Sequence, residues 1–85
     1  MFELEQSSRL AFPVRFKERT LETVGDAITL FSKLSSEQVD SHYWRRAIIM
    51  MHTAINCRQF LKTATINLET ATLMDRPTSA EQPRN

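Results

Sequence analysis

The sequence predicts an α+β fold, in which an N-terminal β-hairpin packs on about three α-helices within a single small domain. Large apolar residues occupy alternate positions over residues 10–16, which is typical of a half-buried strand. From residue 24 onward they recur at spacings of three and four, which is typical of amphipathic helices. A length of 85 residues leaves room for one core only.

The first strand contains four apolar residues at alternate positions: Leu10, Phe12, Val14 and Phe16. Pro13 cannot donate a ladder hydrogen bond, so the strand begins there or lies at the edge of its sheet. The stretch TLETV, residues 20–24, predicts a short second strand. The intervening turn lacks the Gly or Asn that tight hairpin turns favour.

Helix signals begin directly after the second strand. Thr23 stands three residues before Asp26, which is the pattern of a helix N-cap with a carboxylate in the first turn. Four apolar residues then share one helical face: Val24, Ala27, Phe31 and Leu34. The polar stretch SSEQVDS, residues 35–41, breaks this helix, and Asp40 or Ser41 caps the next one.

Residues 43–57, YWRRAIIMMHTAINC, form one largely buried helix on a helical wheel, with Trp44 at the centre of a wide apolar arc. Arg58 would fall within that arc if the helix continued, so we expect the helix to break near Asn56. A further helix then begins at Phe60. Residues 63–72 also fit a strand, because Thr is frequent and apolar residues alternate there, but the Ala and Leu spacing favours the helix.

The chain divides into three parts by composition. Residues 1–9 are expected to form a flexible N-terminal arm, and residues 10–74 the compact domain. Residues 75–85 are expected to be a disordered tail, because they contain two prolines among polar neighbours and almost no apolar side chains.

No pattern of reactive side chains points to catalysis. His52 and Cys57 are five positions apart and point in different directions on a helix, so they do not form a nucleophile–base pair. His42 and His52 are ten apart and lack the i, i+4 spacing of helical zinc ligands. Gly25 is the only glycine, which excludes a glycine-rich phosphate loop. We therefore expect no enzyme, no bound metal and no cofactor.

Charge and cysteine content restrict the expected partners and cellular location of the chain. Eleven basic residues against ten acidic ones leave almost no net charge to steer the chain toward nucleic acid or a membrane surface. The single cysteine excludes an intramolecular disulfide and is compatible with a reducing compartment. No secretory signal or membrane-spanning run is visible, so a cytoplasmic location is expected.

Apolar residues outside the predicted core faces favour a function through association. These residues are Ile49, Ile66 and Leu73. A homodimer would bury them, and a non-enzymatic adaptor or regulator of a larger partner is the leading hypothesis.

Two other functions remain open. A nucleic-acid-binding accessory protein would use the basic hairpin residues Arg15, Lys17 and Arg19, although Glu18 and Glu22 interrupt that patch. A small-ligand binder would need a cavity between the hairpin and the helices.

The order of these segments resembles the short alphaproteobacterial proteins grouped as domain-of-unknown-function family 982. The stretches that carry the resemblance are PVRF, RTLETV, DAITLFSKL, YWRRAIIMMHTAI and FLKTATINLETA, between Phe12 and Met74. The chain departs from the family at Leu34-Ser35, where a Trp-Pro pair is expected, and at Asn56, where a Gly is expected. The resemblance implies a compact α+β fold with a small hairpin against helices, and it implies no catalytic residue.

Overall fold

The computed structural model describes residues 3–75 and has the α+β fold that the sequence predicts. Strands β1 (Arg9–Phe16) and β2 (Arg19–Thr23) form an antiparallel hairpin. The helices that follow are α1 (Val24–Ser32), α2 (Ser36–Asp40), α3 (His42–Asn56) and α4 (Leu61–Met74), with a 3-10 turn, η1 (Arg58–Phe60), before the last.

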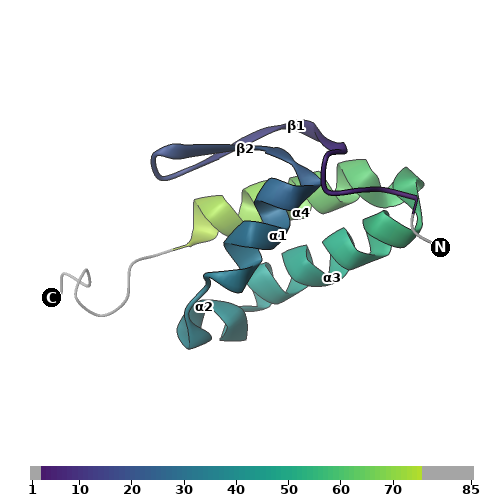
Figure 1. Ribbon diagram of the computed structural model, residues 1–85. Coiled ribbons are helices and arrows are strands. Elements are labelled where there is room, and N and C mark those ends of the chain that lie inside the picture. Colours follow the sequence, from purple (N-terminus) through teal and green to yellow (C-terminus); the bar gives the residue numbers. More distant parts are fainter. Residues whose placement is uncertain (1–2, 76–85) are drawn as a thin grey trace, which may run out of the picture.

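The hairpin and the two long helices form the body of the domain. Strand β1 lies along α4, and α3 packs against α4, with η1 connecting the two helices (Figure 1). Helix α1 contacts β2, and α2 contacts α3. Helix α4 is therefore central, with the hairpin on one side and α3 on the other.

The hairpin turn closes without glycine or asparagine. Phe16 pairs with Arg19, and Val14 with Leu21, while a β-bulge or irregularity separates Arg9 from Val14 in the register. Lys17 occupies the turn with a φ of 58°, which lies in the left-handed backbone region that residues other than glycine rarely adopt. Its Nζ lies 5.2 Å from the centre of the Phe16 ring, a cation–π contact that stabilises the turn.

Both outer edges of the hairpin are partly blocked. On β1, the Ala11 N–H donates to Thr65 Oγ1 of α4 at 3.1 Å, and Pro13 has no N–H to offer. On β2, the Glu22 N–H donates to Asp26 Oδ2 at 2.9 Å. A further strand would lack these donors, so extension of the sheet by another chain is disfavoured.

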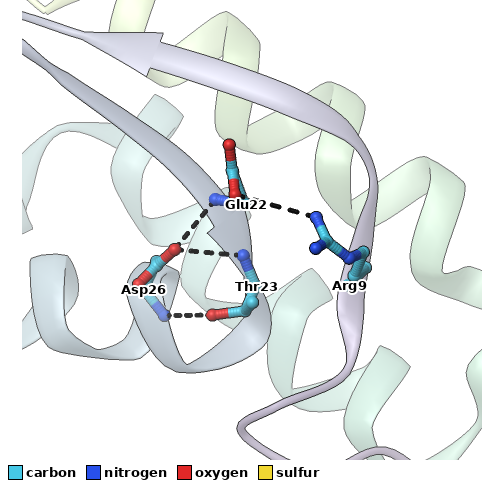
Figure 2. A network of polar contacts seen from close by, with 4 residues as sticks. All are labelled: Arg9, Glu22, Thr23 and Asp26. Atoms are coloured by element: carbon cyan, nitrogen blue, oxygen red, sulfur yellow. Dashed lines mark hydrogen bonds and ion pairs between the residues drawn. The ribbon is translucent and has the colours of Figure 1, made fainter.

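The predicted cap of the first helix is confirmed. The Asp26 N–H donates to Thr23 Oγ1 at 3.1 Å, while Asp26 Oδ2 accepts from the Glu22 and Thr23 N–H groups at 2.9 and 3.2 Å (Figure 2). The hydrogen bond from the Glu22 N–H is the main cause that lowers the pKa of Asp26 below its ordinary value of 3.8. An exposed ion pair, Arg9–Glu22 at 3.7 Å, joins β1 to β2 beside this cap.

The short helix α2 corrects the prediction that residues 35–41 are only a break between helices. Ser35 Oγ accepts from the Gln38 N–H at 3.2 Å, and Gln38 Oε1 accepts from the Ser35 N–H at 2.8 Å. This reciprocal pair is a capping box, and its Ser-x-x-Gln pattern stands in the sequence. The helix after it is capped by Ser41, one of the two predicted caps.

The long helix α3 is a core helix, as predicted. Trp44 is 1% exposed, and the other buried residues of the helix are Ala47, Met51 and Ala54. The helix ends at Asn56, close to the predicted break, because Cys57 adopts an extended conformation with φ of −147°. Arg58 consequently lies exposed in η1.

The last segment is helical, which resolves the alternative between helix and strand for residues 63–72. Helix α4 buries Ala64, Leu68 and Ala71 together with Thr65. The Thr65 hydroxyl donates to the Leu61 carbonyl at 2.8 Å while accepting from Ala11, so this buried polar group is satisfied.

Residues 3–8, here called the strap, precede β1, contain a turn, and form hydrogen bonds to both α3 and α1. The Glu3 and Leu4 N–H groups donate to the Ile55 carbonyl at 2.8 and 3.1 Å, and the Gln6 carbonyl accepts from the Gly25 N–H at 2.8 Å. Leu4 is 6% exposed and belongs to the core. The packed domain thus includes the strap, which the sequence assigned to a flexible arm.

Met1, Phe2 and all of the predicted tail except Asp75 lie outside the described residues. Within residues 3–75, no helix combines the length and apolar character that crossing a membrane requires.

Candidate functional site

The predicted nucleic-acid contacts gather around the hairpin turn. Arg15, Lys17 and Arg19 are all exposed, at the end of β1, in the turn and at the start of β2. The only ion pair among residues 3–75 is Arg9–Glu22, so none of the three forms one there. The acidic Glu18 lies between Lys17 and Arg19 and reduces the local positive charge.

The three predicted association residues are exposed but fall into two patches. Ile66 and Leu73 are 44% and 76% exposed and lie two turns apart on the outer face of α4, opposite its buried residues. Ile49 is 62% exposed and lies on α3, opposite the buried Trp44 face. Because α3 and α4 bury their inner faces against each other, Ile49 faces away from the other two.

Leu73 shares a shallow depression with the hairpin turn, here called the tip groove. Its volume is about 320 Å³, and its lining residues are Arg15, Phe16, Lys17, Thr72, Leu73 and Asp75. One predicted association residue and two predicted nucleic-acid contacts therefore meet in one place. The sequence did not indicate this meeting, because residues 15–17 and 72–75 are far apart along the chain.

A larger groove lies beneath the strap and is called the strap groove below. Its volume is about 480 Å³, and its lining residues are Leu4, Glu5, Gln6, Val24, Ile28, His52, Ile55 and Asn56. They come from the strap, the first half of α1 and the end of α3. The predicted ligand cavity lay between hairpin and helices, whereas this groove is formed by the strap and two helices.

Close packing of the strap on α1 shapes this groove. A Cβ atom on Gly25 would lie 2.9 Å from the Gln6 carbonyl oxygen, so only glycine allows the strap to approach this closely. The Val24 N–H donates to the Ser8 carbonyl at 2.8 Å, and the Arg58 N–H donates to Glu3 Oε1 at 2.8 Å. The single glycine of the sequence was the available signal for a close backbone approach.

The lining of the strap groove is mostly apolar with few polar groups. Among the described residues that line it, Glu5 is the only acidic one, and none is Lys or Arg. His52 and Asn56 lie one turn apart on α3, and Asn56 Nδ2 donates to the His52 carbonyl at 3.0 Å. An apolar surface with a few polar groups is typical of small-molecule sites.

The other candidate residues stay apart. Cys57 is half-buried after the end of α3 and is absent from the strap groove. The His42 ring lies 4.1 Å from the Tyr43 ring, centre to centre. Over the described part of the chain, no three His, Cys, Asp or Glu residues lie together in a way that would hold a metal ion.

Comparisons with known proteins give no match: no family model, no curated protein and no solved structure matches this chain. The resemblance to domain-of-unknown-function family 982 therefore stays a prediction.

Proposed function

We propose that this chain is a non-enzymatic cytoplasmic protein that acts by association, as a homodimer that serves as an adaptor or regulator. The outer face of α4 is the proposed dimer surface. The observation that supports it is the exposure of Ile66 and Leu73 on one face of a helix whose other sides pack against β1 and α3. A lone cysteine fits the reducing cytoplasm.

Association would add buried apolar surface to a small domain that has one core. Ile66 is 44% and Leu73 76% exposed, so burying what remains open contributes about 1–2 kcal/mol for each side chain to association. A two-fold dimer would bury both twice, since each copy presents the same face. The blocked edges of the hairpin favour contact through helix side chains rather than through an added strand.

Sedimentation velocity of the untagged full chain tests this proposal. The wild type is expected to sediment as a dimer, and the double variant Ile66→Ser/Leu73→Ser as a folded monomer with an unchanged circular dichroism spectrum. Ile49→Ser is the matched control, because it makes the same chemical change on the outer face of α3. A monomeric wild type, or a dimer lost through Ile49→Ser and not through the double variant, would contradict the proposed surface.

The alternative function is nucleic-acid binding by the hairpin turn. It draws support from the exposure of Arg15, Lys17 and Arg19 and from their lack of ion pairs within the described residues. Phosphate contacts make affinity fall steeply with salt, whereas an apolar dimer persists at high salt. Fluorescence anisotropy with a labelled single-stranded oligonucleotide distinguishes the two. If this function holds, binding weakens with salt and is lost in Arg15→Glu/Lys17→Glu; salt-independent or absent binding contradicts it.

A further inference from the structure

We propose that the strap groove binds a small molecule with an apolar body and a positively charged amine. This site lies on the strap, α1 and α3, and so is separate from the outer face of α4 on which self-association is proposed. The inference therefore goes beyond association and does not depend on it.

The apolar body of the ligand follows from the lining. Leu4 and Val24 are buried at the base, while Ile28 and Ile55 are half-buried and keep part of their surface open. A volume of about 480 Å³ is within the usual range for small-molecule sites, which are mostly apolar with a few polar groups. Covering the open parts of Ile28 and Ile55 would remove apolar surface from water.

The groove is built into the fold and needs no rearrangement to form. The strap is held at one end by two hydrogen bonds to the Ile55 carbonyl and at the other by the Gly25 and Val24 N–H groups. These bonds fix the distance between the end of α3 and the start of α1. Pre-organisation of this kind lowers the entropic cost of binding.

The charge of the ligand follows from charge complementarity. Among the described residues that line the groove, Glu5 is the only acidic one, and none is a Lys or Arg that could receive an acid. A carboxylate ligand would therefore be repelled, whereas an ammonium group would be attracted to the carboxylate of Glu5. His52 and Asn56, on the α3 side, offer further hydrogen-bonding atoms.

Nuclear magnetic resonance titration of the full chain with three eight-carbon probes tests the proposal at mildly alkaline pH. The probes are octylamine, octanol and octanoate, which share one tail and differ in charge. The Gly25 amide is the reporter, because it is the only glycine amide and it donates to the strap. We expect saturable shifts at Gly25 and along the strap, with octylamine bound most tightly and octanoate about tenfold more weakly.

Two pairs of variants locate the contacts. Ile28→Ser is expected to lower the affinity for octylamine about tenfold. The matched control Ile49→Ser, on the far side of α3, is expected to leave this affinity unchanged. Glu5→Gln is expected to lower the affinity for octylamine about threefold and to reduce the ratio of the octylamine affinity to the octanoate affinity. Glu18→Gln, in the hairpin turn, is expected to leave both affinities unchanged.

Several results would overturn the inference. They are equal or tighter binding of octanoate, shifts that do not saturate or that lie away from the strap, and an unchanged preference in Glu5→Gln.

Discussion

The two ends of α3 differ in how they are closed. At its start, the ring of Trp44 lies edge-on to the ring of Phe16 at 5.6 Å, and the Trp44 Nε1–H donates to Asp75 Oδ1 at 2.9 Å. Gln38 Nε2 donates to the same oxygen at 3.0 Å. One large side chain and one carboxylate therefore join α2, α3, the end of α4 and the hairpin at this place.

At the other end of α3, the contacts are made mainly by the backbone. The Ile55 carbonyl accepts both N–H groups from the strap, and Leu4 is the buried side chain that the strap contributes. The neighbouring buried residue of α3 is Ala54, which fills little space. The strap groove, of about 480 Å³, lies beside this end.

Hydrogen bonds and side-chain volume therefore have different roles in this small domain: the first hold a segment in position, and the second fills the space beneath it. Backbone hydrogen bonds hold the strap in place but do not fill the space beneath it, whereas Trp44 fills the space at its own end. We therefore expect the Trp44 end to contribute most to the free energy of unfolding, and the strap end to be available for binding.

The largest expected effect is at the closed end. Trp44→Ala should lower the free energy of unfolding by about 3–5 kcal/mol, because it leaves a cavity and removes one of the two hydrogen bonds to Asp75 Oδ1. Ile55→Ala, at the open end, should cost about 1–2 kcal/mol, since its side chain is only half-buried. Urea denaturation followed by circular dichroism measures both. Equal losses would contradict the contrast between the two ends.

The carboxylate at the closed end should have the next largest effect. Asp75→Ala removes the acceptor for the Trp44 Nε1–H, and leaving that buried donor unpaired should cost about 1–3 kcal/mol. Asp75→Asn keeps an oxygen acceptor and is the matched control, with a smaller expected loss. Urea denaturation gives the free energies, and Trp44 fluorescence, the chain's only tryptophan signal, reports the local change. Similar losses in the two variants would rule out the hydrogen bond as the cause.

A glycine substitution probes the open end. Gly25→Ala places a Cβ against the Gln6 carbonyl oxygen, so the strap must shift, and we expect a net cost of about 1 kcal/mol despite the better helix propensity of alanine. Hydrogen exchange should become faster at Glu3, Leu4 and Gly25, while the amides around Trp44 keep their protection. Thr29→Ala, at an exposed position of α1, is the control. Unchanged strap protection would show that the close approach is unimportant.

The smallest expected effect concerns acid stability beside the strap. The folded chain lowers the pKa of Asp26 below 3.8, so its ionised form stabilises the fold. This contribution is fully present above the unfolded pKa and is lost as the pH falls through the lower folded pKa. Asp26→Asn should remove this part of the acid sensitivity and cost about 0.5 kcal/mol at neutral pH. Urea midpoints measured from neutral to strongly acidic pH test it; identical acid profiles would contradict it.

Much of the fold could be predicted from the sequence, because the patterns that indicate each element are local. The hairpin, the Thr23–Asp26 cap and the end of the helix near Asn56 each depend on residues within a short stretch of chain. The Ser35–Gln38 capping box is equally local and was present in the sequence, yet its polar composition concealed the helix that it begins.

The candidate sites could be predicted from the sequence only in part. The helical pattern correctly placed Ile49, Ile66 and Leu73 outside the core faces, because exposure on a helix follows from its own period. It could not show that Leu73 lies beside Lys17 or that Ile49 faces elsewhere, since those relations depend on how the helices and hairpin pack.

The sequence by itself determined the α+β class, the hairpin and the long helix that contains Trp44, because periodicity and capping act over one or two turns of chain. The apolar arc favoured a core position for Trp44, and the tertiary structure decided it. Only the tertiary structure decided that Asp75 pairs with Trp44, that the strap lies on Gly25, and that a groove remains between α1 and α3. These features join residues that belong to different elements and lie far apart along the chain. Their geometry follows from the packing of whole elements, which no local pattern specifies.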